Sequence, residues 1–332
     1  MALLEVRDLT VVFQRRGEQP FTAVDGVSFD VEPGQTVGLV GESGCGKSVT
    51  SLAIMGLLPK RGATVTGSVK FEDTDLLRLS GNQMRDRRGR DLGMVFQDPL
   101  SSLNPVITIG VQVAEVLERH QGMSRKKALT EAAGLLDKVG IPDPNRRISE
   151  YPHQLSGGMR QRALIAMALA CKPRLLIADE PTTALDVTIQ AQILSLLKGL
   201  VQDTGTALIM ITHDLGVVAG LCDEVNVLYG GRVVERAERH ELFAEPRHPY
   251  THGLLASIPR LDAPRGERLM PITGSVSDNI PWDSACAFAP RCPNALDVCR
   301  EVTPEQEWRG SRLLRCHNPV QPAAAETEEA SV

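Results

Sequence analysis

Aromatic residues are scarce in this chain, because Phe, Trp and Tyr together make up 4% of its 332 residues. This scarcity argues against a surface for single-stranded nucleic acid, since such surfaces stack the bases on aromatic rings. The formal net charge is −5, which gives no global reason to expect a polyanionic partner. We therefore expect no nucleic acid among the partners.

Long hydrophobic runs are also missing. No stretch reaches the roughly 18 apolar residues of a membrane-spanning helix. The start, MALLEVRDLTVVFQRR, lacks the basic segment and long apolar run of a secretory signal. Both absences favour a cytoplasmic protein, in which disulfides are rare. The seven cysteines are therefore expected to be free thiols or metal ligands.

Apolar runs alternate with helical patterns over the first 250 residues. RLLIAD and ALIMIT are short and almost wholly apolar, and a helical pattern lies between them. Such strands predict an α/β fold with a parallel sheet that is covered on both faces. Helical spacing from about Ile109 to Val139 predicts a helical segment, and VNVLYGGRVVE predicts a hairpin around its two glycines.

The stretch LVGESGCGKSVTS contains the complete P-loop pattern Gly41-x-x-x-x-Gly46-Lys47-Ser48. It follows a buried strand pattern and opens a helical one, so backbone N–H groups and the helix N-terminus would face phosphates. Lys47 is expected to neutralise the β- and γ-phosphates, and the Ser48 hydroxyl is expected to bind Mg²⁺. The sequence thus predicts a nucleotide site here. Cys45 stands at a variable position of the loop.

An acidic pair ends the strand LLIAD. Ligands of open α/β sheets bind at the carboxyl ends of strands, where Asp179 and Glu180 would lie. We expect Asp179 to hold Mg²⁺ and Glu180 to polarise the attacking water. A helix-capping carboxylate before Pro181 is the structural alternative.

The stretch LSGGMRQR, residues 155–162, resembles the signature motif of ATP-binding cassette (ABC) ATPases, and the motifs around it follow the order of that family over roughly residues 3–250. The resemblance makes Gln97 the Q-loop glutamine, His213 the switch histidine and Asp186 the D-loop aspartate. Phe13 takes the place of the aromatic that stacks on adenine, with Phe21 as a weaker candidate.

The resemblance also implies the architecture. We expect an α/β P-loop NTPase core over 1–250, with a mixed sheet, an N-terminal antiparallel β part and a helical subdomain at about 98–160. A small accessory region with four cysteines would follow over 251–320. The acidic, small-residue tail over 321–332 is expected to be disordered.

A second anion site is expected at the signature motif. A serine and two glycines at a helix start offer a capping hydroxyl and bare N–H groups. In the family this motif closes on ATP held by the other subunit, so Ser156, Gly157, Gly158 and Gln161 would act in a dimer. The expected roles are catalysis by Glu180, His213 and Gln97, Mg²⁺ binding by Ser48, Gln97 and Asp179, and ATP binding by Phe13, Gly41, Ser43, Gly44, Cys45, Gly46, Lys47, Ser48 and Val49.

Three stretches point to one branch of the family. These are EPRHPYTHGLLASIP, VFQDPLSSLNP and DEPTTALDVTIQAQIL, which resemble the dipeptide and oligopeptide importer ATPases. The extended cysteine-bearing tail resembles the D-type subunit of that branch more than its F-type partner. This implies ATP and Mg²⁺ as cofactors, and as partners two permeases, a second homologous ATPase and an extracytoplasmic binding protein. The chain would lie at the cytoplasmic face of the membrane. An importer of nickel or glutathione remains an alternative, as does a soluble ABC ATPase that acts on DNA or ribosomes.

Four of the cysteines are spaced Cys286-x5-Cys292-x6-Cys299-x16-Cys316. Zinc knuckles use closer pairs and common ferredoxins use other spacings, so spacing alone predicts a four-thiolate site for Zn²⁺ or an iron–sulfur cluster. Buried small hydrophobic residues are the structural alternative. CAFAPRC resembles the importer motif that binds a [4Fe–4S] cluster in some members, although Ala285 stands where glycine is frequent. His317 would be a spare ligand.

Overall fold

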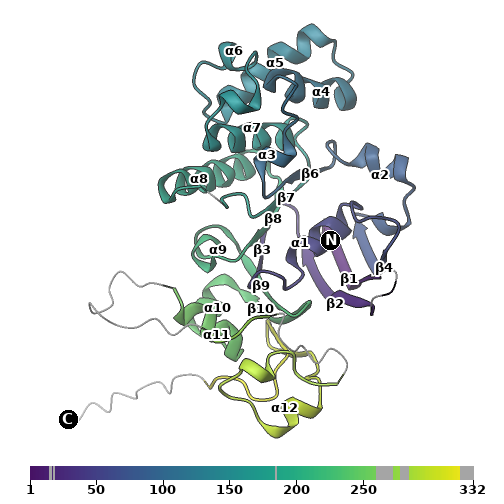
Figure 1. Ribbon diagram of the computed structural model, residues 1–332, viewed down its shortest axis with the longest axis vertical. Helices are drawn as coiled ribbons and strands as arrows, with labels where there is room; N and C mark the ends of the chain where they lie inside the picture. The colour runs from purple at the N-terminus through teal and green to yellow at the C-terminus, as the bar shows by residue number, and fades with distance from the viewer. Residues whose placement is uncertain (15–16, 18, 184, 259–271, 277–283, 322–332) are drawn as a thin grey trace, which may run out of the picture.

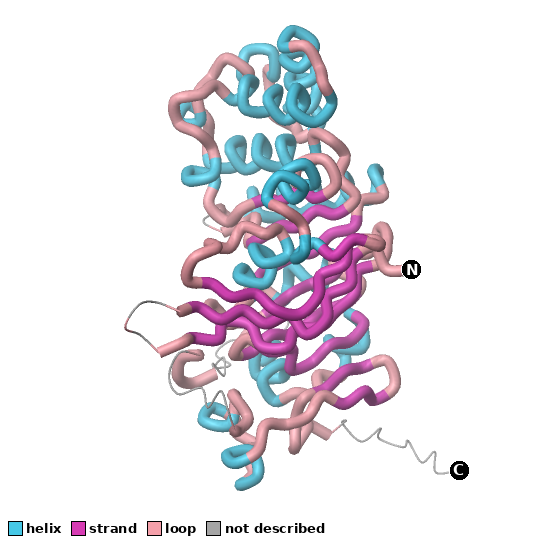
Figure 2. The backbone as a smooth tube through the Cα atoms, turned by 90° about the vertical axis from the view of Figure 1, so that its right-hand side faces the viewer, coloured by secondary structure: helices cyan, strands magenta, loops and turns pink. Residues whose placement is uncertain are grey.

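The computed structural model describes residues 1–14, 17, 19–183, 185–258, 272–276 and 284–321. Its strands form two sheets, an eight-stranded sheet of order β11-β12-β10-β9-β3-β8-β7-β6 and a four-stranded sheet of order β2-β1-β4-β5. Figure 2 shows the sheets stacked through the middle of the molecule, with helices above and the C-terminal region below. The expected α/β class is confirmed.

The middle of the large sheet is parallel. Strands β3 (Thr36–Val40), β6 (Leu92–Val95), β7 (Leu175–Asp179), β8 (Ala207–Thr212) and β9 (Glu224–Tyr229) run in one direction. All residues of β7 and β8 are buried, as expected for apolar strands that are covered on both faces. The predicted hairpin is present, because β10 (Arg232–Glu238) pairs antiparallel with β9 and makes the sheet mixed.

The N-terminal sheet is antiparallel. Strand β1 (Leu4–Phe13) pairs with β2 (Phe21–Val31) and with β4 (Ala63–Phe71), while β5 (Thr74–Asp75) extends the edge. Helix α1 (Lys47–Ile54) lies against these strands, and Ile54, Phe29 and Phe71 share one buried core. This core joins the small sheet to one face of the large sheet. It fixes the start of α1 beside the ends of β1 and β2.

A helical subdomain stands above the sheet (Figure 1). It comprises α3 (Pro99–Ser102), α4 (Ile109–Gln121), α5 (Arg125–Lys138), α6 (Pro144–Arg147) and the start of α7 (Gly157–Leu169). The helical pattern predicted from Ile109 to Val139 is two helices. Gly122 has a φ of 64° and ends α4, since this left-handed conformation is easy only for glycine. Helix α2 (Gly81–Arg87) precedes β6, and α8 (Val187–Thr204) and α9 (Leu215–Leu221) follow β7 and β8.

The accessory region continues the large sheet. Strands β11 (Glu307–Arg309) and β12 (Arg312–Leu314) form a hairpin, and β12 pairs with β10. Helices α10 (Arg239–Ala244) and α11 (Pro249–Ala256) connect the two regions, so α11 crosses the boundary expected at residue 250. A short turn, η3 (Ala289–Arg291), and α12 (Asp297–Glu301) follow. The tail expected to be disordered lies, except for residue 321, outside the described residues.

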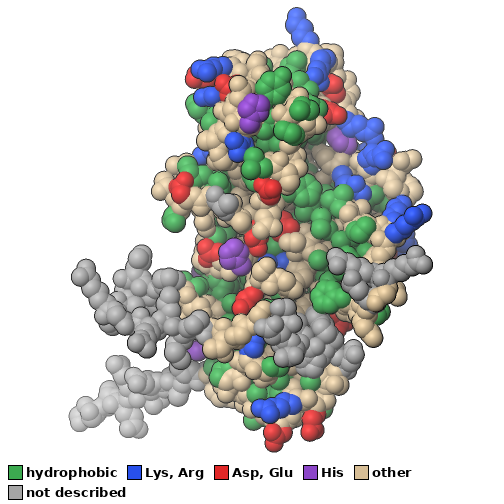
Figure 3. Space-filling view, in the orientation of Figure 1, with side chains coloured by type: hydrophobic (Ala, Val, Ile, Leu, Met, Phe, Trp, Pro, Cys, Tyr) green, Lys and Arg blue, Asp and Glu red, His purple; other side chains and the backbone are tan. Residues whose placement is uncertain are grey.

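Across the described ranges, no helix combines the length and the apolarity needed to cross a bilayer. On the face in Figure 3, basic, acidic and apolar side chains are interspersed. Arginines near α2 have acidic partners: Arg87 and Arg90 pair with Asp91, and Arg119 pairs with Asp86. These pairs offset the basic charge near that helix.

Candidate functional site

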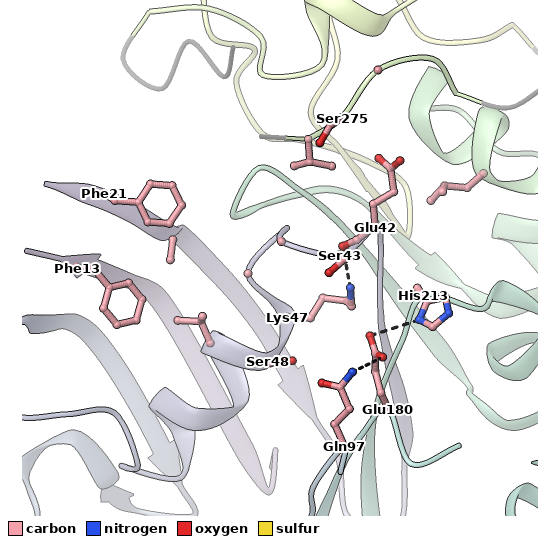
Figure 4. Close-up of a pocket in the computed structure, with 17 residues that line it drawn as sticks. Phe13, Phe21, Glu42, Ser43, Lys47, Ser48, Gln97, Glu180, His213 and Ser275 are labelled. Carbon is pink, nitrogen blue, oxygen red and sulfur yellow. Dashed lines mark hydrogen bonds and ion pairs between the residues drawn. The ribbon is translucent and has the colours of Figure 1, made fainter. Parts of the chain in front are cut away.

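A cavity of about 1080 Å³ opens where several strands of the large sheet end. The P-loop follows β3, Gln97 follows β6, Glu180 follows β7 and His213 follows β8. Parallel neighbours end at one edge of a sheet, so residues far apart in the sequence meet there. The lining includes ten of the predicted residues: Phe13, Ser43, Gly44, Gly46, Lys47, Ser48, Val49, Gln97, Glu180 and His213. Figure 4 shows their side chains around this cavity.

The P-loop wraps around the Lys47 side chain. The Lys47 ammonium donates to the Gly41 carbonyl at 2.7 Å and to the Glu42 carbonyl at 2.9 Å. Gly46 has a φ of 96°, and a Cβ there would lie 2.5 Å from the Ala23 carbonyl oxygen, so only glycine fits. Lys47 is thus a buried cation at the start of α1, where backbone N–H groups also favour an anion.

An oxygen pair suited to Mg²⁺ lies next to the loop. The Ser48 hydroxyl donates to the Asp179 carboxylate at 2.9 Å, which brings together two residues 131 positions apart. Asp179 is 5% exposed, and burial raises the pKa of its carboxyl, with the neighbouring Glu180 charge acting in the same direction. Hydroxyl and carboxylate oxygens are the ligands that Mg²⁺ prefers, so this pair fits the ion.

The Glu180 carboxylate is held by three side chains. It accepts hydrogen bonds from the Gln97 amide at 3.0 Å and the Thr183 hydroxyl at 2.9 Å. His213 Nδ1 lies 3.4 Å from its other oxygen. Glu180 also has a φ of 45°, a left-handed conformation that residues other than glycine adopt at some cost. The three residues predicted to be catalytic are therefore brought together.

Thr183 was not among the predicted residues. Its contact with Glu180 is local, since the two residues are three positions apart in the stretch EPTT. Only the turn after β7 decides which hydroxyl of the two threonines reaches the carboxylate. The motif could have suggested the pair but not the choice.

Two aromatic side chains stand at one end of the cavity. Phe13 ends β1 and Phe21 starts β2, and these positions are partners in the ladder between the two strands. Both line the cavity, on the side away from Glu180 and His213 (Figure 4). Either ring could stack on a base, so both residues remain candidates for the adenine contact.

Three predicted residues of the site lie behind the lining. Gly41, Cys45 and Asp179 are absent from the lining in the described part of the chain. The Cys45 side chain is fully buried, and burial raises the pKa of its thiol. Its predicted contact with ATP could thus come only from the backbone of the loop.

The signature and D-loop residues lie outside this cavity. Ser156 caps α7 by accepting from the Met159 N–H at 3.3 Å, and Asp186 caps α8 by accepting from the Ile189 N–H at 3.0 Å. Ser156 and Gly157 are exposed at the helix start, as an intersubunit role requires. Gln161 is 1% exposed, and its amide nitrogen is buried without a hydrogen-bond partner among the described residues. The action of these residues on a second subunit stays a prediction.

Residues of the accessory region complete the cavity wall. Leu254, Gly274, Ser275 and Val276 line it, and Ser275 lies opposite Glu42 in Figure 4. The Glu42 N–H donates to the Tyr250 hydroxyl at 2.8 Å. No motif pointed to this contribution, because these residues follow a change in composition that only suggested a domain boundary.

The four tail cysteines face one small cavity, which is also lined by His248 and His317. All four are free thiols. Burial raises the pKa of Cys286, that of Cys292 to about 11 and that of Cys316 to about 12. Over the described residues, however, no group of three or more His, Cys, Asp or Glu side chains is arranged to hold a metal ion. The cysteines gather as expected, but a [4Fe–4S] cluster is not supported by their arrangement.

Known proteins are similar along nearly the whole chain. Residues 24–183 match the family described as ABC transporter, and residues 234–299 match the oligopeptide/dipeptide transporter C-terminal region. The dipeptide transport ATP-binding protein DppD of Bacillus subtilis is 53% identical over 95% of this chain and 94% of its own length. The oligopeptide transport ATP-binding protein OppD of Escherichia coli is 47% identical over 96% and 94%.

Solved structures agree with the fold. A dimeric ATP-binding cassette in a post-hydrolysis state bound to ADP and Pi superposes with a TM-score of 0.64 at 28% identity, over 71% of this chain and 98% of that one. A cassette from Clostridium perfringens, part of an ABC transporter complex, gives 0.61 at 26% identity, over 74% and 91%. The chain therefore belongs to the ATP-binding proteins of the dipeptide and oligopeptide ABC transporter family, and it is an ATPase of the ABC type.

Proposed function

We propose that this chain hydrolyses ATP to energise the import of peptides through partner permeases in the cytoplasmic membrane. The observation that carries the proposal is the union, in one chain, of the nucleotide cavity and the oligopeptide/dipeptide transporter C-terminal region. Relatives that match over nearly the full length are named for dipeptide and oligopeptide transport. The chain would act at the cytoplasmic face of that membrane.

Several residues in and beside the cavity have a part in this proposed reaction. Lys47 binds the β- and γ-phosphates once it leaves the carbonyls of its own loop. Ser48, Asp179 and Gln97 would hold Mg²⁺, which would supply positive charge to offset that of the phosphate oxygens. Phe13, with Phe21 beside it, packs on the adenine.

Glu180 orients and polarises the attacking water as a general base. Its carboxylate is held in place by contacts with Gln97, Thr183 and His213. His213 lies beside this carboxylate and also lines the cavity, where it can donate to a phosphate oxygen. All these groups come from the ends of neighbouring strands or from the turns after them.

A second subunit is part of the proposal. Ser156 and Gly157 present a capped helix start away from the cavity of their own chain, which suits ATP held by another cassette. The second cassette would be a homologous ATPase, giving a heterodimer that sits on two permeases and receives peptide from a binding protein. Asp186 would contact the opposite P-loop.

Two alternatives make different predictions. Import of nickel or glutathione keeps the whole assembly and changes only the solute. A soluble ABC ATPase that acts on DNA or ribosomes would need no permease. The transporter C-terminal region over 234–299 favours the importer.

The test is reconstitution of this chain with its two permeases and second ATPase in proteoliposomes that contain the binding protein. We expect ATP hydrolysis to rise when di- or oligopeptides are added, and Glu180→Gln in this chain to abolish uptake. If only nickel or only glutathione raises the rate of ATP hydrolysis, that solute replaces peptides as the proposed substrate. Association with ribosomes or DNA, without recruitment by the permeases, would refute the importer.

We also propose that the four tail cysteines bind a [4Fe–4S] cluster with a structural or regulatory role. What supports the proposal is the donor chemistry of four thiols that line one small cavity, which suits iron–sulfur clusters and also Zn²⁺, although the described residues are not arranged as a metal site. Anaerobic purification should give a brown protein that absorbs at about 400 nm. The double variant Cys292→Ser/Cys316→Ser should lose this absorption. Colourless protein with stoichiometric zinc would show that the site binds Zn²⁺ and not a cluster. Metal-free protein would refute the site.

A further inference from the structure

One ion pair joins the accessory region to the P-loop. The Arg291 guanidinium donates to the two Glu42 carboxylate oxygens at 2.7 and 3.0 Å, across 249 positions of sequence. The side chain of Arg291 is 6% exposed and that of Glu42 is 31% exposed. This two-pronged geometry is the strong form of a charge-assisted hydrogen bond.

The same guanidinium fastens a wall of the nucleotide cavity. It donates to the carbonyl of Thr273 at 2.7 Å and to that of Gly274 at 3.1 Å. Gly274, Ser275 and Val276 line the cavity. Arg291 thus holds two cavity walls, one from the P-loop and one from residues 272–276, in fixed relation to each other.

The charge of Glu42 makes this contact important for nucleotide binding. Glu42 lines the cavity, and its carbonyl accepts from the Lys47 ammonium that would bind phosphate. A carboxylate without a partner at this rim would repel the triphosphate, and partial burial would weaken the screening of that repulsion. The Arg291 cation offsets the charge and turns both carboxylate oxygens toward the accessory region.

We propose that Arg291 is a positioning residue of the nucleotide site: it neutralises Glu42 and fixes residues 272–276 as a wall of the ATP cavity. This makes the accessory region an integral part of the site rather than an appendage. The inference rests on the proposed role of the cavity as the ATP site.

Arginine is required at this position for a geometric reason. Five donors in a plane can bind the Glu42 carboxylate and the carbonyls of residues 273 and 274 together, whereas a lysine ammonium is a point charge with three donors. The guanidinium also lies over the Tyr229 ring, 5.8 Å from its centre. Lysine would keep the positive charge but could not also hold the carbonyls that fix the cavity wall at residues 273 and 274.

The test measures the affinity of the full chain for ATP, ADP and adenosine by competition with a fluorescent ATP analogue, at low and high salt. We expect Arg291→Met to weaken ATP about tenfold at low salt and ADP less, with adenosine unchanged, because repulsion from Glu42 acts only on phosphates. Arg291→Lys should fall between Arg291→Met and the unchanged chain. In the double variant Arg291→Met/Glu42→Gln, ATP affinity should recover to the level of Arg291→Lys, since the repelling charge is gone while the bonds to the carbonyls of residues 273 and 274 are still missing.

Arg309→Met is the matched control, because Arg309 is an exposed arginine of the same region that pairs with Glu307. It should leave all three affinities unchanged. Equal weakening of ATP and adenosine by Arg291→Met, failure of Glu42→Gln to restore ATP binding, or wild-type ATP affinity in Arg291→Met would each overturn the proposal. A thermal melt of each variant separates loss of folding from loss of affinity.

Lys47→Ala distinguishes this inference from the assignment of the cavity. If Lys47→Ala binds ATP as tightly as the unchanged chain, the cavity is not the ATP site, and the proposed function fails with the inference. If Lys47→Ala loses ATP while Arg291→Met keeps it, only the role of Arg291 is wrong.

Discussion

The Gln97 amide donates a hydrogen bond to the Glu180 carboxylate at 3.0 Å, although 83 positions separate the two residues. The bond links the end of β6 to the end of β7, and so links the helical subdomain that follows Gln97 to the residue assigned to water activation. A movement of that subdomain would therefore shift the Glu180 carboxylate through this hydrogen bond.

Replacing Glu180 by glutamine should stop hydrolysis without stopping ATP binding. The amide cannot accept a proton from water, so we expect turnover to fall by roughly a hundredfold or more, the range of a lost general base. The variant should accumulate ATP-bound dimers with its partner ATPase, which size-exclusion chromatography detects. Near-normal hydrolysis would remove Glu180 from its assigned role.

Replacing Thr183 by valine should slow hydrolysis with little change in ATP affinity. The shape is retained, but the hydroxyl that donates to Glu180 at 2.9 Å is lost, and the carboxylate is less well aimed. We expect a decrease of about tenfold in kcat, the scale of a lost hydrogen bond of about 1.4 kcal/mol. Thr183→Ser keeps the donor and serves as the control. Equal loss in both variants would contradict the contact.

Asp179→Asn should stabilise the nucleotide-free, Mg²⁺-free protein at neutral pH. Burial raises the pKa of Asp179, so the folded state holds this proton more tightly than the unfolded state does. The associated stability is complete below the unfolded pKa and is lost as the pH rises through the folded pKa. The thermal midpoint of the variant should therefore exceed that of the unchanged chain at pH 7, and the gap should close as the pH falls toward 4.

The same substitution should weaken the binding of Mg²⁺ with ATP, because it removes a carboxylate from the ion's expected ligands. Asparagine can still accept the Ser48 hydrogen bond, so loss of that bond does not confound the comparison. A variant with lower stability at every pH would contradict the expectation that burial disfavours the ionised form of Asp179.

Arg312→Met should destabilise the whole chain. Arg312 on β12 pairs at 3.1 Å with Glu235 on β10, and the two side chains are 4% and 0% exposed. Removing the cation leaves a buried carboxylate, which costs about 3 kcal/mol or more. Chemical denaturation should detect this loss, while Arg309→Met should cause none. Glu235→Gln in the Arg312→Met background should recover part of the stability.

Much of the nucleotide site could be predicted from sequence because its motifs act locally. The spacing from Gly41 to Ser48 sets the loop that wraps Lys47, and RLLIAD sets a buried strand that ends at Asp179. The alternation of apolar strands and helices gave the α/β class and the order of elements. The spacing of the four tail cysteines predicted one group, and all four line one small cavity, although no metal-binding arrangement is found among the described residues.

The contacts that join distant segments were decided only by the tertiary structure. Gly122 divides the helix expected from Ile109 to Val139, and β12 adds the accessory region to the main sheet. The pairing of Arg291 with Glu42 depends on how η3 packs beside the P-loop, 249 positions away. Local patterns determine backbone conformation and burial over a few residues. Contacts between residues far apart in the sequence depend on how whole elements pack, and no local spacing in a single sequence predicts that packing.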